Sequence, residues 1–484
     1  MSETIVFFKF LSQQIPVVPG TDSYRKWEKL AVPLTMRFFL FNVTNADKVM
    51  QFGDKPILQE VGPFVFRENR FKANVSFEHG GEHVLYREAK EYFFDPIHSK
   101  GHSLDDMIIV PSIPEIAMAG KLSKQAESVS ALSTFLYNML NAAFSTTQTR
   151  LFSMRRVGDL LFDGYTVRAL EQLINVTSNI PNDPLNIKSP LPNNRFGFFY
   201  LKNGTEDPES AVWRTHTGLN DPSRFGQVIT YDNHSENQCW RRSYYCNTML
   251  GTDGSQFAPN LDASQNHPSA HPASEHTQSM FKRALSLSSP SSAETVSIRR
   301  SLPHAPTSPA DHLMRFEHSS SDSSGKRRLF VYNPDIYRWV YLSFEGRSEV
   351  RGIQAYRYTL PDSFYTAPSD APENACFCTK ASEFNLAEAN RKFLATAFLN
   401  SSTPQQVQEA YRRTFPPQCR LHGILDISHC RQAPIIISAP HFFKGDPLLI
   451  HSVEGLHPSE ELHKTFVDIE PVSCQSNGFF IENY

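Results

Sequence analysis

The sequence contains no apolar run long enough to cross a membrane as a helix. Its longest apolar segments, such as Pro434–Ser438, have the length of a strand, whereas a membrane helix needs about 20 consecutive apolar residues. The first 13 residues contain the apolar patch Ile5–Phe8, but Lys9 interrupts the pattern and no small-residue cleavage site follows. As written, the chain is therefore expected to carry neither a membrane anchor nor an evident export signal.

The motifs that mark common catalytic sites are also missing. The sequence has no GxSxG, HExxH, P-loop, GxGxxG or CxxC pattern. The pair Cys376 and Cys378 is spaced too tightly for a usual zinc site. His441, His457 and His463 lie near acidic residues in the sequence, but carboxylates beside histidines are common on protein surfaces. We therefore predict no enzyme activity, no metal site and no cofactor.

Neither sign of charge dominates the 484-residue chain, which carries 47 basic and 50 acidic residues and a net charge of −3. Basic residues occur in short pairs such as Arg155-Arg156 and do not form a stripe, so no nucleic-acid partner is expected. Hydrophobic residues make up 40% of the chain, which allows a large buried core.

Cysteine is absent before residue 239, and five of the seven cysteines lie between Cys376 and Cys474. Six N-glycosylation sequons are present, at Asn42, Asn74, Asn175, Asn203, Asn233 and Asn400. Clustered cysteines and sequons together favour an oxidising, extracytoplasmic environment. This inference conflicts with the missing export signal.

Alternation of apolar and polar residues predicts antiparallel β-structure over much of the chain. Within residues 41–66, an apolar strand ends in the sequon at Asn42, a polar loop covers Ala46–Pro56, and a second strand follows. Alternation continues over Phe71–Phe77, and a Gly-Gly turn then leads to the hairpin partner Val84–Tyr86. Other strands are expected at 34–41, 212–218, 228–231, 329–332, 339–344, 352–358, 423–428, 435–438 and 466–469.

Helical spacing interrupts this β-pattern in the first half of the chain. One segment carries apolar residues at helical positions, namely Val129, Leu132, Leu136, Met139, Leu140 and Ala143. A second segment carries Val157, Leu160 and Leu161. The two segments predict a helical hairpin inserted into a β-protein. Its apolar face either packs on the sheet or is partly exposed as a binding surface.

Several stretches, taken in order, resemble the class B scavenger receptor family. They are Tyr24–Trp27, Phe41–Phe66, Leu151–Tyr165, Cys246–Leu261, Leu329–Leu360, Cys376–Cys378, Gly423–His441 and Val453–Pro471. The resemblance implies an α+β fold, in which a large antiparallel β-barrel core carries a helical bundle at its apex and encloses an internal lipid tunnel. It also implies two membrane helices, one at each end, which this chain lacks as written.

A member of this family is expected to bind lipids or lipoproteins at the helical apex and to pass lipid through the tunnel. The alternative is a lysosomal trafficking receptor that binds a hydrolase through the same helices. Both imply an extracytoplasmic domain at the plasma membrane or the lysosomal membrane. The apical residues expected to contact the ligand are Phe135, Leu136, Met139, Leu140 and Phe144.

The segment Ser145–Thr149 differs from the corresponding segment of fatty-acid-binding members, which carries lysines. Here the central residues are Thr146, Thr147 and Gln148. A carboxylate would find hydrogen bonds in this segment but no opposite charge.

The expected domain organisation follows the resemblance and the composition. Residues 1–13 form an atypical N-terminus, and 14–261 form the first part of the ectodomain, with a helical apex at about 125–173. Residues 328–473 form its second part, with a helical insert at about 383–413, and 474–484 form a divergent tail. Residues 262–327 are dominated by Ser, Pro, His and Ala. They are predicted to be disordered, because they cannot bury enough apolar area to offset their ordering entropy.

The resemblance also implies two disulfide bonds. Cys246 is expected to pair with Cys376, and Cys378 with Cys419. In the loop-entropy description, linking positions about 130 residues apart removes about 4–5 kcal/mol of unfolded-state freedom.

A third bridge of the family joins Cys430 to a cysteine whose place Tyr337 takes in this chain. That bridge cannot form here. Cys430 is therefore expected to stay free or to pair with Cys239 or Cys474.

Overall fold

The computed structural model describes residues 16–30, 34–126, 131–147, 150–178, 189, 191–204, 210–240, 244–258, 328–350, 352–368, 370–378, 419, 421–431, 433–470 and 476–480. The expected disordered segment 262–327 and the expected helical insert at 383–413 lie outside these ranges.

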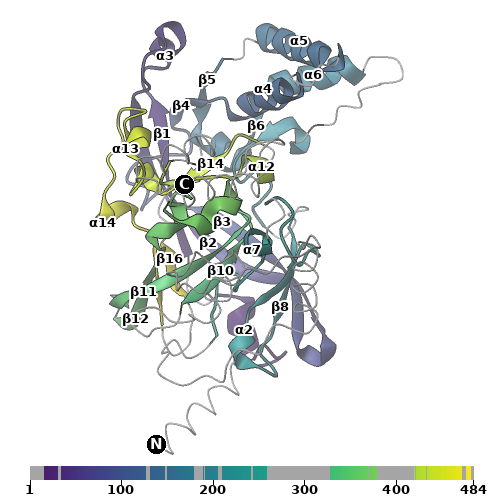
Figure 1. Ribbon diagram of the computed structural model, residues 1–484, viewed down its shortest axis with the longest axis vertical. Coiled ribbons are helices and arrows are strands. Elements are labelled where there is room, and N and C mark those ends of the chain that lie inside the picture. The colour runs from purple at the N-terminus through teal and green to yellow at the C-terminus, as the bar shows by residue number, and fades with distance from the viewer. Residues whose placement is uncertain are drawn as a thin grey trace, which may run out of the picture.

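Antiparallel strands form two five-stranded sheets that curve into a half-barrel (Figure 1). The first sheet has the order β1-β2-β3-β8-β9 and contains β1 (Leu34–Val43), β2 (Leu58–Glu78), β3 (His83–Phe94), β8 (Val212–His216) and β9 (Val228–Tyr231). The second has the order β10-β11-β12-β15-β16 and contains β10 (Leu329–Asn333), β11 (Arg338–Val350), β12 (Ile353–Thr359), β15 (Phe466–Ile469) and β16 (Ser476–Phe480).

A short loop segment joins the two sheets edge to edge. The amide of Val228 in β9 donates to the carbonyl of Gly251 at 2.8 Å, and the amide of Thr252 donates to the carbonyl of Phe330 in β10 at 3.0 Å. Gly251 has a φ of +102°, and a Cβ there would lie 2.2 Å from the Phe330 carbonyl. Glycine is therefore the residue that lets the loop approach β10 closely enough to continue the hydrogen bonding.

The hairpin of β1 and β2 lies at the edge of the first sheet. Phe38 in β1 is paired with Phe64 in β2, and both side chains are buried. The register shifts between Phe38 and Leu40, next to Gly62 with a φ of +147°. A Cβ at Gly62 would lie 2.7 Å from the Phe38 carbonyl oxygen, so this irregularity in the ladder depends on glycine.

The connection between β1 and β2 is not the irregular loop expected for residues 46–56. It contains helix α3 (Ala46–Phe52), which ends at Gly53 in the left-handed conformation. The Asn45 side chain closes the connection, because it accepts from the Ile57 amide and donates to a backbone carbonyl, both at 2.8 Å. The sequence did not reveal α3 because a seven-residue helix is too short to display a clear apolar period.

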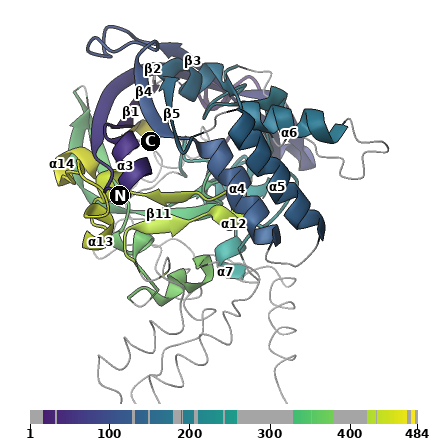
Figure 2. The ribbon, with the colours of Figure 1, turned by 90° about the horizontal axis from the view of Figure 1, so that it is seen from above.

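Three longer helices cover the upper end of the half-barrel as drawn in Figure 1: α4 (Ile113–Ala126), α5 (Ala131–Thr146) and α6 (Arg168–Ser178). Helix α5 contacts both α4 and α6, and the helices lie side by side when seen from above (Figure 2). We call these three helices the apical layer.

The expected helical hairpin is wrong in its second half. The partner of α5 is α4, which precedes it, whereas Val157, Leu160 and Leu161 belong to or flank a single π-helical turn, η2 (Asp159–Asp163). All three side chains are almost fully buried in a core that also contains Phe38. Three apolar residues at helical spacing fit one turn buried on every side as well as they fit an amphipathic helix.

The remaining described elements are short. The other helices are α2 (Asp22–Glu28), α7 (Tyr244–Asn247), α12 (Ser428–Arg431), α13 (Pro447–Ile450) and α14 (Glu460–His463). Short 3-10 helices cover His79–Gly81, Pro192–Asn194, Pro222–Arg224, Asp362–Tyr365, Pro372–Phe377 and Pro440–Phe442. Two-stranded sheets pair β4 (Met107–Pro111) with β5 (Phe152–Arg156), β6 (Tyr165–Thr166) with β7 (Arg195–Phe196), and β13 (Ile424–Asp426) with β14 (Ile436–Ser438). Across the ranges that the structure describes, none of the helices has both the length and the apolar character of a membrane span.

Candidate functional site

The apical residues expected to contact ligand lie on α5, namely Phe135, Leu136, Met139, Leu140 and Phe144. The side chains of Met139 and Phe144 are partly buried, and those of the other three lie outside the part of the chain that the structure describes. Helix α5 continues to Thr146, so the expected polar connection Ser145–Thr149 begins as the last turn of this helix. A ligand-binding role for these residues stays a prediction.

A cavity of about 700 Å³ lies at the base of the apical layer. Its wall combines segments that are distant in the sequence: the β1–α3 connection, the start of α4, strands β4 and β5, the residues after α5, and the start of α6. We call it the apical cavity.

Ser112 holds two walls of the apical cavity together. Its hydroxyl donates to the Arg150 carbonyl at 2.7 Å, and its amide donates to the Leu151 carbonyl at 2.8 Å. Its own carbonyl accepts from the Ile116 amide, which starts the hydrogen bonding of α4. One buried serine therefore fixes the beginning of α4 against the beginning of β5.

The lining of the apical cavity is amphipathic. Its larger apolar side chains are Met50, Ile109, Phe152 and Met154. Its basic side chains are Lys48, Arg150, Arg155 and Arg168, and its acidic ones are Asp47 and Glu115.

Two buried polar atoms in the apical cavity lack a partner. Among the described residues, neither Oε2 of Glu115 nor Nε of Arg155 has a hydrogen-bond partner. Burial raises the pKa of the Glu115 carboxyl, and the nearby charge of Arg155 acts in the opposite direction. The guanidinium of Arg155 lies 4.0 Å from the centre of the Tyr165 ring. A buried polar atom without a partner is unfavourable, so this part of the cavity is suited to bind a polar group.

The sequence patterns did not point to the apical cavity. Its residues come from positions 44 to 168, and no local motif unites them. The one available signal was the concentration of basic residues between Arg150 and Arg168, of which the pair Arg155-Arg156 entered only the argument against a nucleic-acid partner.

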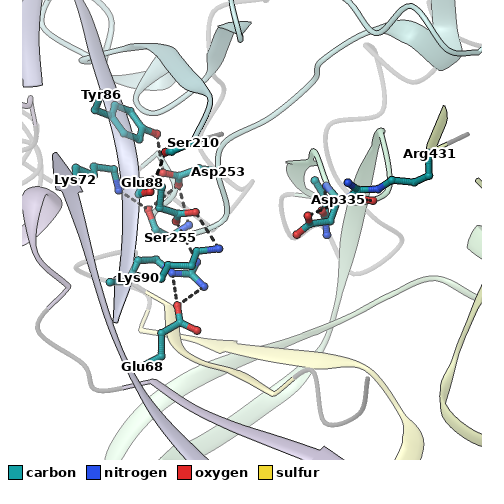
Figure 3. Close-up of polar contacts among 12 residues, drawn as sticks. Glu68, Lys72, Tyr86, Glu88, Lys90, Ser210, Asp253, Ser255, Asp335 and Arg431 are labelled. Atoms are coloured by element: carbon teal, nitrogen blue, oxygen red, sulfur yellow. Dashed lines mark hydrogen bonds and ion pairs between the residues drawn. The ribbon is translucent and has the colours of Figure 1, made fainter. Parts of the chain in front are cut away.

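A second cluster of charges lies inside the half-barrel (Figure 3). The ammonium group of Lys72 in β2 lies 3.2 Å from the Asp253 carboxylate, and the Tyr86 hydroxyl donates to the same carboxylate at 2.8 Å. The Lys72 side chain is only 2% exposed, and it also lies 5.0 Å from the ring centres of Trp27 and Tyr86. Burial acts to raise the pKa of Asp253, but Lys72 and hydrogen bonds outweigh it and lower the pKa to about 2.

Arg70 extends this inner cluster along β2. Its guanidinium lies 2.7 Å from Glu68 on the same strand and 3.4 Å from Glu88 on β3. Lys90 also pairs with Glu88, at 3.1 Å. We refer to the ion pairs of Lys72 and Arg70, with these partners, as the inner charge cluster.

Three disulfide bonds link segments that lie between β9 and β10 and between β12 and β15. They join Cys246 to Cys376, Cys378 to Cys419, and Cys239 to Cys430, with Cα atoms 6.1, 5.6 and 4.9 Å apart. The first two are the pairs that the family resemblance implies. Of the alternatives left open for Cys430, the structure has the pairing with Cys239.

The residue that replaces the family's cysteine, Tyr337, lies beside this disulfide framework. Its carbonyl accepts from the side-chain amide of Asn237 at 2.8 Å and from the indole N–H of Trp240. Trp240 follows Cys239 directly and is almost fully buried. The backbone of Tyr337 therefore helps to hold the segment that brings Cys239 to Cys430.

Four of the six sequon asparagines are exposed: Asn74, Asn175, Asn203 and Asn233. Asn42 is partly buried, and its side-chain oxygen accepts from the Ile109 amide at 2.8 Å. Asn400 lies outside the described residues. Glycosylation at each of these positions stays a prediction.

The histidines noted in the sequence form a packed pair. His441 and His463 stack with their ring centres 4.3 Å apart. Nδ1 of His441 accepts from the His457 amide at 3.0 Å, and its Nε2 lies 3.2 Å from the Glu60 carboxylate on β2. These contacts attach the segment before β15 to the first sheet. Within the described ranges, no three His, Cys, Asp or Glu residues are grouped so that they could hold a metal ion.

The half-barrel, the apical layer and three disulfide bonds define the class of this protein as a disulfide-bonded α+β domain of the kind found in oxidising, extracytoplasmic environments. The chain belongs to the CD36 family, whose family model matches residues 2–272 and 318–475. The unmatched residues between these ranges lie within the segment 262–327.

Several curated proteins are similar to this chain along almost its whole length. Lysosome membrane protein 2 of Mus musculus is 26% identical over 455 residues, which cover 94% of this chain and 69% of that protein. Scavenger receptor class B member 1 of Bos taurus is 25% identical over 462 residues, covering 95% of this chain and 66% of that protein. Sensory neuron membrane protein 2 of Manduca sexta is 24% identical over 468 residues, which cover 96% of this chain and 72% of that protein. The family relationship assigns this chain to the extracytoplasmic side of the plasma membrane or the lysosomal membrane.

Proposed function

We propose that this scavenger-receptor-like protein binds lipids or lipoproteins at its apical end. The observation that carries the proposal is the amphipathic apical cavity with exposed apolar side chains around it. Met154 is 60% exposed, Met50 is 49% exposed, and Phe52 at the end of α3 is 74% exposed. Apolar side chains in contact with water beside a polar cavity suit a ligand with an apolar body and a polar head.

The proposal extends to passage of lipid from the apical cavity into the half-barrel. Phe38, Phe66 and Phe162 pack against one another in the core beneath the apical layer, and an internal route for a hydrocarbon chain would pass between these rings. The inner charge cluster would restrict the route of hydrocarbon to the aromatic side of the interior.

Binding is tested with vesicles of phosphatidylcholine and with a lipoprotein particle on the immobilised protein. We expect the variant with Met50→Ser and Phe52→Ser to bind both more weakly. The matched control is Ile353→Ser, because Ile353 is 51% exposed but lies on β12 in the half-barrel. Unchanged binding by the double variant, or equal loss in the control, would overturn the apical placement.

Passage into the interior is tested separately with a phosphatidylcholine that carries a photoreactive group at the end of one acyl chain. Labelling of peptides that contain Phe38 and Phe66 would support an internal route. Labelling confined to α3 and β5 would remove the internal route and leave surface binding in place.

The alternative function, capture of a hydrolase for transport to lysosomes, uses the same helices. It predicts that a protein is retained on the apical layer in a pH-dependent manner while vesicles are not bound. A pull-down at neutral and at acidic pH, alongside the vesicle measurement, separates the two functions.

A further inference from the structure

We propose that the apical cavity holds an anionic group, such as the phosphate of a lipid headgroup, between Arg150, Arg155 and Arg168, and that Glu115 must be protonated when this group binds. The proposal rests on the proposed function, because it names the ligand chemistry of the same cavity. It also assigns a residue, Glu115, that makes binding dependent on pH.

The charges around the apical cavity are unbalanced. Four basic side chains and two acidic ones line it. Among the described residues, no ion pair engages Arg150, Arg155 or Arg168, in contrast to Arg156 on the same strand. Arginine without a carboxylate partner is a preferred ligand for phosphate, because its planar N–H groups match the oxygen geometry.

The starts of two helices border the same space. Ser112 and Glu115 at the beginning of α4 line the cavity, and so do Thr166 and Arg168 at the beginning of α6. The helix dipole is positive at this end, and it acts on an anion even where, as at Pro114 in α4, the first turn lacks a backbone N–H. Two helix starts therefore add favourable potential for an anion to that of the arginines.

The buried atoms without partners are the independent sign that a ligand binds here. Glu115 is 6% exposed, and its Oε2 has no hydrogen-bond partner among the described residues. Nε of Arg155 is also buried and has no hydrogen-bond partner among the described residues. An oxygen of a bound phosphate would accept from Arg155, and a protonated Glu115 would donate to the same group.

The protonation state of Glu115 decides the sign of its effect on an anion. As a carboxylate it repels a phosphate, whereas as a carboxylic acid it donates a hydrogen bond. Burial raises the pKa of Glu115, so protonation requires less acid than for an exposed carboxyl. Affinity for an anion therefore rises as pH falls.

The other charged or titratable groups around Glu115 do not explain a rise in affinity for an anion as pH falls. Arg155 from β5 contributes a guanidinium group, and Tyr165 from β6 stays neutral because burial, with the charge of Glu115, raises its pKa to about 12. Arg150, Arg168 and the pair Asp47 and Lys48 complete the lining, and no histidine is among the described residues that line the cavity.

The test is calorimetric titration of the full chain with dihexanoyl phosphatidylglycerol, whose charge is constant between about pH 5 and 7.5. Dihexanoyl phosphatidylcholine is the zwitterionic control, and glycerophosphoglycerol is the same anionic headgroup without acyl chains. We expect the phosphatidylglycerol to bind more tightly than the phosphatidylcholine and to gain about tenfold in affinity on acidification. Equal affinity of the headgroup alone would show that a free anion, and not a lipid, is the ligand.

Three variants test which residues bind the anionic headgroup and which residue makes binding depend on pH. Glu115→Gln should bind phosphatidylglycerol at neutral pH as tightly as the unchanged protein does in acid, with no further pH dependence. Arg150→Gln combined with Arg168→Gln should lower the affinity at both pH values by about tenfold or more. Arg156→Gln is the matched control, because Arg156 is adjacent in sequence but already pairs with Asp105, Asp159 and Asp163.

The outcomes separate this inference from the proposed function. If neither lipid binds, the proposed function fails. If both lipids bind equally at all pH values, the proposed function stands and the anionic site is wrong. If the pH dependence persists in Glu115→Gln, Glu115 is not the group that titrates. Arg150 and Arg168 are exposed, so the double variant tests the anionic site even if Glu115→Gln does not fold.

Discussion

The inner charge cluster and the apical cavity are both built from Arg, Lys, Asp and Glu, but they differ in how their charges are satisfied. In the inner cluster, Lys72 and Arg70 each lie within ion-pair distance of a carboxylate. In the cavity, Glu115 and Arg155 each have a buried atom without a hydrogen-bond partner among the described residues. Lys72 in the inner cluster and Glu115 in the cavity are both buried, so burial alone does not explain the difference.

The two regions are suited to different tasks: the inner charge cluster to stabilising the fold, and the apical cavity to binding a ligand. A buried charge that is paired and hydrogen-bonded holds strands in place, and it has no remaining capacity for a ligand. A buried polar atom that lacks a partner weakens the folded state slightly and leaves that capacity open. We therefore expect substitutions in the inner cluster to change stability and substitutions in the cavity to change binding.

The largest effect is expected for Asp253→Asn. The substitution leaves the Lys72 ammonium buried without an opposite charge, which costs about 3–5 kcal/mol in the free energy of unfolding. Urea denaturation measures the loss. The matched control is Asp335→Asn, because Asp335 pairs with Arg431 at 3.2 Å (Figure 3) with both side chains open to solvent, and such pairs contribute at most about 1 kcal/mol. Similar losses in both variants would remove the distinction between the inner cluster and surface pairs.

Acidification should change the stability contribution of Asp253 in the inner charge cluster at a lower pH than that of Glu115 in the apical cavity. The pKa of Asp253 is lowered from 3.8 to about 2, so its contribution is fully present above pH 3.8 and is lost as pH falls towards 2. The pH-dependent part of this contribution to the free energy of unfolding amounts to roughly 2 kcal/mol. Urea denaturation of the unchanged protein and of Asp253→Asn should therefore give a constant difference down to about pH 4 and a smaller one below it. A difference that shrinks between neutral pH and about pH 5 would contradict this assignment.

A smaller effect of opposite sign is expected for Glu115→Gln. The pKa of Glu115 is raised by burial, so the ionised carboxyl destabilises the fold, and stability falls as pH rises through the raised pKa. The uncharged amide removes this penalty at neutral pH, and we expect a gain of up to about 1 kcal/mol that disappears in acid. Thermal denaturation at two pH values measures it. A loss of stability at neutral pH would mean that the Glu115 carboxylate is satisfied after all.

The smallest effect is expected for Arg156→Gln, next to the cavity. Arg156 pairs with Asp105 at 2.9 Å and with Asp159 at 3.1 Å, but its side chain is 33% exposed, so the pairs contribute less than about 1 kcal/mol. Binding in the cavity should not change, because these contacts lie outside its lining. A change in lipid binding comparable to that of the Arg150 and Arg168 variant would show that nearness to the cavity, and not the lack of a partner, determines the effect.

The strands were predictable because their signal is local. Alternation over Phe71–Phe77 identified part of β2, and the expected hairpin partner Val84–Tyr86 lies in β3, which pairs with β2. The same alternation did not reveal that the charged residues of β2 point inward. Glu68 is buried because Arg70 on the same strand pairs with it, and Lys72 is buried because Asp253 in a distant loop pairs with it. Charges at every second position on β2, facing charges on β3, were the signal available in the sequence.

The helical features were harder to predict, because apolar spacing along the sequence does not show what surrounds a segment in the fold. The apolar spacing of α5 was correct, but spacing cannot tell an amphipathic helix from a turn that is buried on all sides, as at Leu160 and Leu161. Helix α3 was missed because it spans only seven residues. Its position matters, because the connection that contains it forms one wall of the apical cavity.

The sequence by itself determined which segments form strands, where cysteines are available and which family the pattern resembles, since all of these depend on neighbouring residues or on residue identity. Only the tertiary structure decided that Cys430 pairs with Cys239, that charges of β2 face inward and that residues from 44 to 168 share one cavity. These outcomes depend on which distant segments pack together. The free energy of a buried charge is set by the partner that packing brings to it, and a local pattern does not contain that partner.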